Sequence, residues 1–255
     1  MKDFMSGSKE VHRAPAPATA EARVVHERAM WAHVVPFVMW LFLMQMLPDP
    51  PSQGYAWRSL ICLALLLGFR PWRFGYPPLR IRNLPLAFAV GIAVFAVWVF
   101  PESDWLRRRA PDIHAFYDRW LVGLWPPGRP SQPLTETPYA PETAGWFLSL
   151  VRLAGSAFVI AIIEEFFFRG FVYRWLQSRD WLDCDPGRFD RPAFWLTVLV
   201  FAVEHEQWFA GALAGIAYGW LYLRTRDIWA AAFAHVVTNY TLGWYVLTTQ
   251  SYQFW

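Results

Sequence analysis

The chain has 255 residues, of which 56% are hydrophobic, 19% are aromatic and only 17% are charged. A soluble domain carries about 25% charged residues, so this composition favours a membrane protein. The net charge is +3, but the basic residues gather in short loops between apolar runs, where membrane topology explains them better than nucleic-acid binding does.

The first 28 residues are expected to form a disordered cytoplasmic tail. They are rich in charged residues and contain the stretch APAPATAEA, which cannot bury enough apolar surface to fold alone. A cleavable signal peptide would place an apolar stretch and a small-residue cleavage site near the start, and neither is present. The first apolar run is therefore expected to remain as an anchor, and residues 29–255 to form a single transmembrane domain.

Seven apolar segments follow the tail. A transmembrane helix needs about 20 mostly apolar residues, and fewer where neighbouring helices surround it. The segments cover residues 31–47, 57–69, 84–100, 146–176, 193–205, 210–223 and 228–247. The sequence therefore predicts an all-α, polytopic integral membrane helical bundle with about seven transmembrane helices.

The arginines predict the orientation of these helices. Lys and Arg are retained on the cytoplasmic side of a membrane, and here arginines gather in alternate loops, at Arg70, Arg73, Arg80 and Arg82, at Arg174, Arg179, Arg188 and Arg191, and at Arg224 and Arg226. We therefore expect a multi-pass protein of the cell (inner) membrane with a cytoplasmic N-terminus. The segment 101–144 is then a non-cytoplasmic loop, in which apolar residues at helical spacing predict an amphipathic helix lying in the interface.

Strongly polar side chains occur inside three of the apolar segments. They are Glu164, Glu165 and Arg169 in the fourth segment, His205 in the fifth, and His235 with Asn239 in the seventh. A charged group in hydrocarbon costs several kcal/mol unless it is paired or hydrated, so such residues are candidates for a functional site. At 1.5 Å per helical residue, the three segments deliver these groups to similar depths of roughly 12 to 20 Å. Acid/base chemistry within the membrane is therefore expected.

Helical spacing predicts different roles for the two glutamates. Glu165 and Arg169 are four residues apart with the acid first, the favourable order for an ion pair on one face. Glu164 points about 100° away from Glu165, so it is the carboxylate left without a fixed cation. Such a carboxylate suits a general base that takes a proton from water.

The histidines and the asparagine offer hydrogen bonds to the reacting groups. His235 and Asn239 share one face and can donate toward an oxygen on which negative charge develops. His205 can supply a second hydrogen bond to the water or a metal-ligating nitrogen. Structural interpretations stay open, because His205 could be a satisfied buried histidine, and His235 with Asn239 could hold two helices together.

The motifs EEFFFR (164–169), FAVEH (201–205) and HVVTN (235–239) follow one another along the chain. In this order they resemble the motifs EExxxR, FxxxH and HxxxN of the CPBP family of intramembrane proteases, which includes type II CAAX prenyl endopeptidases and bacteriocin-processing and immunity homologues. The resemblance covers residues 145–247 and implies that they form the catalytic core, although characterised relatives have eight transmembrane helices.

The resemblance also implies a role for each matched residue. Glu164 would activate a water molecule with His205, while His235 and Asn239 would stabilise the oxyanion. Glu165 and Arg169 would be a supporting ion pair.

The predicted function is hydrolysis of a peptide bond, near the C-terminus of a membrane-associated or prenylated protein, by glutamate-activated water. The protein or peptide substrate would arrive through the lipid or from the cytoplasm, and membrane lipid is the other expected partner. No cofactor is expected to be required; if zinc takes part, Glu164, His205 and His235 would hold it. Two other classes stay open, a non-catalytic immunity or scaffold protein and a proton-coupled transporter.

Overall fold

The computed structural model describes residues 20–47, 53–122 and 137–255, and every regular element within these ranges is a helix. All seven segments expected to cross the membrane are helical. They correspond to α1 (Ala20–Met46), α2 (Gln53–Phe69), α3 (Leu84–Val99), a long helix over Pro141–Gln177 with a kink at Gly145, α9 (Arg191–Val203), α10 (Trp208–Thr225) and α11 (Ile228–Thr249). The prediction of an all-α protein is confirmed for the described residues.

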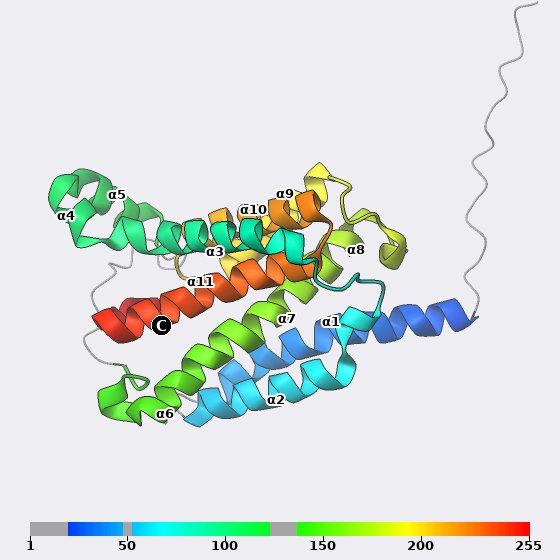
Figure 1. The fold of residues 1–255 in the computed structure, drawn as a ribbon, viewed down its shortest axis with the longest axis horizontal. Coiled ribbons are helices and arrows are strands. Elements are labelled where there is room, and N and C mark those ends of the chain that lie inside the picture. The colour runs from blue at the N-terminus through cyan, green and yellow to red at the C-terminus, as the bar shows by residue number, and fades with distance from the viewer. Residues whose placement is uncertain (1–19, 48–52, 123–136) are drawn as a thin grey trace, which may run out of the picture.

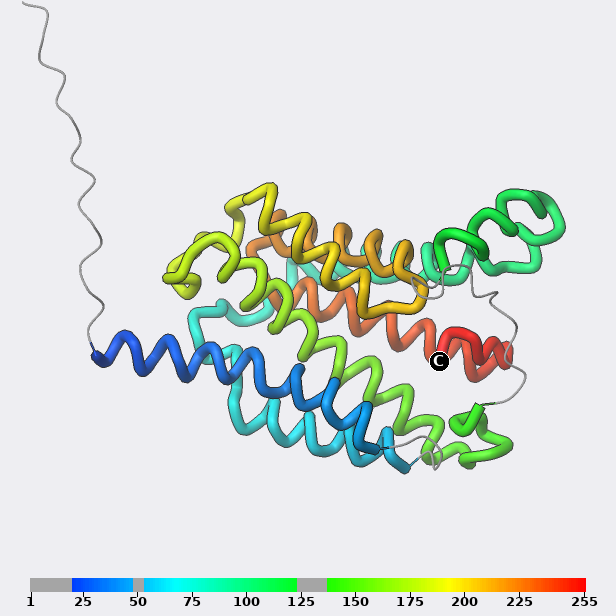
Figure 2. Tube along the Cα trace, turned by 180° about the vertical axis from the view of Figure 1, so that it is seen from behind, coloured from blue at the N-terminus to red at the C-terminus, as the bar shows by residue number. Residues whose placement is uncertain are grey.

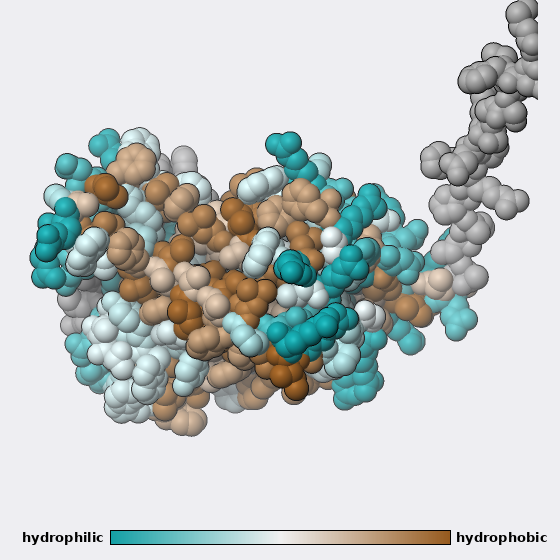
Figure 3. All heavy atoms as spheres, turned by 45° about the horizontal axis from the view of Figure 1, so that its top comes forward, coloured by the Kyte–Doolittle hydropathy of each residue, from teal (hydrophilic) through white to brown (hydrophobic). Residues whose placement is uncertain are grey.

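Three of the described helices are long and apolar enough to span a bilayer. They cover Ala20–Met46, Ile81–Glu102 and Pro141–Gln177. Large apolar side chains are exposed on the outer faces of several helices, for example Leu60, Phe88, Phe147 and Leu199. Figure 3 shows apolar residues gathered over the middle of one face, with hydrophilic residues toward both ends. Because water would penalise so much exposed apolar surface, we conclude that this is an integral membrane protein.

Helix α11 lies in the middle of the bundle (Figure 1). It packs against α3 and α10 on one side and against the helix of residues 141–177 on the other. Helices α1 and α2 pair with each other and cover the far side of that long helix, as the reverse view also shows (Figure 2). The long helix and α11 therefore meet inside the bundle.

The long helix over residues 141–177 is not a regular α-helix. It consists of α6 (Pro141–Ala154), the π-helical η4 (Gly155–Ile160), α7 (Ala161–Glu165), the π-helical η5 (Phe166–Val172) and α8 (Tyr173–Gln177). π-helical turns are rare and frequently mark functional sites. Here two of them flank the short α7, which ends with the paired glutamates.

The N-terminal tail departs from the sequence prediction. Helix α1 begins at Ala20, inside the segment 1–28 that was expected to be disordered. The residues 20–28 read AEARVVHER, and their Ala, Glu and Arg are good helix formers that extend the adjoining apolar helix. Residues 1–19 lie outside the described part of the chain.

The segment 101–144 contains two short helices in its described part, α4 (Asp104–Arg109) and α5 (Pro111–Trp120). Helix α5 lies where the amphipathic helix was predicted. It exposes Ile113, Phe116 and Trp120 while its Tyr117 is buried. The spacing of the exposed apolar residues places them on one face, which suits a helix lying along the membrane surface.

Aspartates fix the first turns of α9, which precedes His205, and of α11, which carries His235. Asp190 accepts a hydrogen bond from the backbone of Ala193 at the start of α9, and Asp227 does the same for Trp229 at the start of α11. Asp227 is fully buried and also accepts from Asn83 Nδ2 at 2.9 Å. These caps satisfy backbone donors that a helix start leaves unpaired.

Gly91 permits the close approach of α3 and α11. A Cβ atom at this position would lie 2.6 Å from the carbonyl oxygen of Ala234 and 2.8 Å from Val237 Cβ. We expect Gly91→Ala to lower the free energy of unfolding by about 1–3 kcal/mol, the usual cost of overpacking. Thermal unfolding of the purified protein in detergent would measure this, with Gly68→Ala as the control, because nothing lies within 4 Å of that position. Equal stabilities of the two variants would contradict the prediction.

Candidate active site

The six predicted site residues come from three helical segments that are distant in the sequence. They are Glu164 and Glu165 at the end of α7, Arg169 in η5, His205 just after α9, and His235 and Asn239 on α11. The structure brings them together inside the bundle, through the contacts described below.

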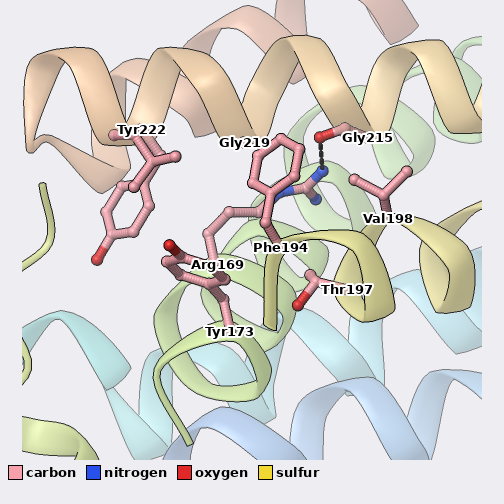
Figure 4. A pocket seen from close by; sticks show the side chains of 9 residues that line it. Arg169, Tyr173, Phe194, Thr197, Val198, Gly215, Gly219 and Tyr222 are labelled. Carbon is pink, nitrogen blue, oxygen red and sulfur yellow. Dashed lines mark hydrogen bonds between the residues drawn. The ribbon is translucent and has the colours of Figure 1, made fainter. Parts of the chain in front are cut away.

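Glu165 and Arg169 form a buried ion pair. Arg169 Nη1 donates to Glu165 Oε1 at 3.1 Å, and their side chains are 2% and 0% exposed. Arg169 Nη2 also donates to the carbonyl oxygen of Gly215 on α10 at 3.1 Å (Figure 4). The guanidinium carbon lies 4.5 Å from the centre of the Phe201 ring. The pair thus joins the long helix to α9 and α10.

A small pocket adjoins Arg169 on the side of α9 and α10 (Figure 4). Its lining includes Tyr173, Phe194 and Gly219, and its volume is about 10 Å³. This is about the space of a single water molecule, so the surroundings of Arg169 are closely packed and offer no room for a larger ligand.

His235 lies between the two glutamates. Its Nδ1 is 3.0 Å from Glu165 Oε1, and its Nε2 is 3.6 Å from Glu164 Oε2. An ionised carboxylate only accepts hydrogen bonds, so Nδ1 carries a proton and donates it to Glu165. The other nitrogen, Nε2, is the one directed toward Glu164. The sequence placed His235 beside Asn239 but did not reveal this contact with Glu165.

Tyr218 of α10 holds the imidazole of His235 in position. The two rings are stacked, with centroids 4.7 Å apart and an interplanar angle of 24°. The Tyr218 hydroxyl donates to Thr238 Oγ1 at 2.7 Å, and Thr238 in turn lies 2.9 Å from the carbonyl oxygen of Gly91. Tyr218 belongs to none of the three motifs, and the sequence did not predict it as a site residue. A tyrosine in an apolar helix needs a hydrogen-bond partner for its hydroxyl, and this need is the feature of the sequence that could have indicated a role for Tyr218.

The backbone orients His205. Its Nδ1 lies 2.7 Å from the carbonyl oxygen of Phe201, and because a carbonyl oxygen only accepts, Nδ1 donates. Nε2 is then left with a lone pair, which can accept a hydrogen bond from water. Gly211 makes room for this histidine, since a Cβ atom there would lie 3.2 Å from His205 Cβ.

Asn239 is anchored to a π-helical stretch. Its Nδ2 donates to the carbonyl oxygen of Ser156 in η4 at 2.9 Å. An amide nitrogen carries two hydrogens, so the second one remains available to another acceptor. Asn239 is thus held in place and keeps one donor.

One cavity connects these groups. Its volume is about 310 Å³, at the lower end of the range for ligand-binding pockets. Glu164, His205, His235 and Asn239 all line it. The spatial convergence that the motifs predicted is therefore present, and the cavity is large enough for water and part of a peptide.

Residues 146–241 match a family model described as type II CAAX prenyl endopeptidase Rce1-like. This region is an Rce1-like domain. The family recognised from the three motifs is thereby confirmed. Comparison with curated proteins and with solved structures gave no match.

All six predicted site residues lie within the Rce1-like domain, but the cavity extends beyond it. Arg58 of α2 and Trp98 of α3 precede the domain and also line the cavity. Arg152 and Glu204 lie within the domain and line the cavity without belonging to the three motifs. The N-terminal helices therefore complete the site.

The residues that would hold zinc do not form a recognisable metal site in the described part of the Rce1-like domain. Glu164 and His235 approach each other to 3.6 Å. However, no group of three or more His, Cys, Asp or Glu side chains among the described residues is arranged to hold a metal ion. The geometry thus does not fit the three-ligand set of Glu164, His205 and His235.

Proposed function

We propose that this protein is an intramembrane endopeptidase that uses Glu164 to activate water. The substrate would be a membrane-associated or prenylated protein, cut at a peptide bond near its C-terminus. The observation that carries the proposal is the convergence of Glu164, His205, His235 and Asn239 on one cavity within an Rce1-like domain.

The first step would be attack of water on the scissile carbonyl carbon. The water donates one hydrogen bond to Glu164 and one to the lone pair of His205 Nε2, which Phe201 leaves free. As the new C–O bond forms, Glu164 takes the proton and the carbonyl oxygen becomes an oxyanion. The remaining N–H group of Asn239 donates to that oxyanion.

His235 would be the second donor to the oxyanion. Its Nδ1 already donates to Glu165, so the ring can donate from Nε2 only when both nitrogens are protonated. That form places a positive charge beside the oxyanion, and the buried Glu165–Arg169 pair and Tyr218 keep the ring in position.

The second step would be collapse of the tetrahedral intermediate. The C–N bond breaks, and Glu164 returns its proton to the leaving amine. The new carboxylic acid gives the second proton of the water to the released amine, so the products are a carboxylate on the membrane-associated part and a short peptide with an ammonium group. The enzyme regains its starting protonation.

A comparison of protein C-termini would test the proposal. Cells carrying the wild-type protein and cells carrying Glu164→Gln would be compared by proteomics of membrane proteins. A shortened C-terminus that occurs only with the wild type supports the proposal and names the substrate. Identical C-termini in both cells, together with an unchanged cellular phenotype, would contradict it.

Hydrolysis is expected to be independent of zinc. No group of three or more His, Cys, Asp or Glu side chains among the described residues is arranged to hold a metal ion, and we assign water activation to Glu164 with His205. Treating the purified protein with a chelator should leave kcat within about twofold of the untreated value. Inhibition by the chelator that added zinc reverses would overturn this assignment.

We further propose that all seven apolar segments cross the bilayer, with the N-terminus in the cytoplasm. Support comes from the helical state of every segment and from the arginines in alternate loops. Labelling of single cysteines, introduced into the loops, with an impermeant reagent would test the proposed sides.

A further inference from the structure

An arginine outside the Rce1-like domain shares the cavity with Glu164. Arg58 belongs to α2 and lines the cavity together with Glu164 and His235. The residue is only 5% exposed. A single bound molecule can therefore touch both the arginine and the glutamate.

The charge of Arg58 has no anionic partner among the described residues. Its guanidinium carbon lies 4.7 Å from the centre of the Trp40 ring and 4.5 Å from that of Tyr55. The buried Nε atom has no hydrogen-bond partner, and no carboxylate of the described chain lies within ion-pair distance of the guanidinium. Aromatic faces attract the charge but cannot accept the N–H groups in the way a carboxylate does.

A second arginine lines this end of the cavity. Arg152 also lines the cavity, and its guanidinium carbon lies 4.6 Å from the centre of the same Tyr55 ring. Figure 1 shows the start of α2 beside α6, the helix that carries Arg152. Two guanidinium groups thus lie around one ring at this end of the cavity.

The long helix gives the distance between this end and the catalytic glutamate. Arg152, Ser156, Ile160 and Glu164 recur every four residues, and all of them line the cavity. The cavity therefore follows this helix over at most about 18 Å, the length that 12 α-helical residues would have at 1.5 Å per residue. An extended peptide advances about 3.3–3.6 Å per residue, so at most about five residues fit between the two ends.

We propose that Arg58 binds the C-terminal carboxylate of the substrate. The bond cut at Glu164 then lies within about five residues of the substrate's C-terminus. The guanidinium binds the two carboxylate oxygens with parallel N–H groups, while Trp40 and Tyr55 hold it in place. This assignment rests on the proposed endopeptidase function and explains how the site recognises the end of a chain.

The first experiment compares three forms of a fluorescent, prenylated CAAX peptide. One ends in a free carboxylate, one in an amide, and one in an amide after a terminal glutamate, so that its only nearby carboxylate is a side chain. The wild type should hydrolyse the free acid with a kcat/KM at least about 10-fold above that of either amide, as expected for a charged hydrogen bond. In Arg58→Gln the ratio of acid to amide should fall to about one.

The ratio of the rates for free acid and amide does not depend on the amount of folded protein, because a smaller folded fraction lowers both rates equally. Arg58→Lys, which keeps the charge without the paired N–H groups, should retain part of the preference. A ratio that is the same with and without Arg58 would overturn the proposal. Hydrolysis of the glutamate-ending amide at the rate of the free acid would overturn the assignment to the C-terminus.

A binding experiment separates this proposal from the proposed function. Peptide affinity would be measured by fluorescence anisotropy with Glu164→Gln protein, which should bind without cutting. The free acid should bind at least about 10-fold more tightly than the amide, and adding Arg58→Gln should remove the difference. If this preference holds but the wild type cuts no peptide, the carboxylate site stands and the endopeptidase proposal fails. Equal affinities for acid and amide would refute the carboxylate site.

Discussion

Glu164→Gln is expected to reduce kcat for peptide hydrolysis by about 10²–10⁴-fold, the usual contribution of a general base. The substitution removes the proton acceptor and barely changes the shape of the side chain. KM should change much less, because Glu164 acts on water and not on the peptide. Steady-state kinetics of the two purified proteins on a fluorogenic peptide would measure both constants.

Glu204→Gln provides the matched control. Glu204 lines the same cavity, lies beside His205 in the sequence, and belongs to none of the three motifs. Its loss should change kcat by less than about 10-fold, below the lower limit for a general base. Equal effects at both positions would mean that the general charge of the cavity matters and that Glu164 has no special role as a base.

The sequence predicted the helices well because the signal for each is local. A run of apolar residues reveals a buried or lipid-facing helix regardless of its neighbours. The error at Ala20 has the same local origin. Charge and the APAPATAEA stretch suggested disorder for residues 1–28, whereas the good helix formers after Ala20 extend α1 toward the N-terminus.

The contacts within the site were harder to predict because they join different helices. Spacing on one helix suggested that Glu165 and Arg169 would meet, and they lie 3.1 Å apart. Spacing gives no information on the rotation of α11 against α7, which brings His235 to Glu165. It also could not reveal η4, whose Ser156 carbonyl oxygen accepts from Asn239.

Arg58 carries the same kind of signal in the sequence as the polar residues of the motifs. It lies within an apolar segment, like Arg152, and the cost of a charge in hydrocarbon applies to both. Neither belongs to the three motifs, so the resemblance implied no role for them. Only the fold reveals that α2 brings Arg58 to the cavity of Glu164.

Arg169→Met is expected to lower the free energy of unfolding by about 3–5 kcal/mol, because it leaves the charge of Glu165 buried and uncompensated. Thermal unfolding in detergent would measure the change. Arg226→Met is the matched control, since Arg226 forms an ion pair with Asp185 in which the two side chains are 60% and 51% exposed. An exposed pair contributes only about 0–1 kcal/mol. Equal losses in the two variants would contradict the prediction.

The double variant Glu165→Gln/Arg169→Met separates folding from chemistry. Removing both charges should restore most of the stability lost in Arg169→Met, because no isolated charge remains buried. Activity should stay at least about 10-fold below that of the wild type, because the amide that replaces the Glu165 carboxylate offers His235 an acceptor without the negative charge that its doubly protonated form requires. If the double variant were both stable and fully active, the ion pair would only hold the fold together, and the proposed role of His235 as a charged donor would be wrong.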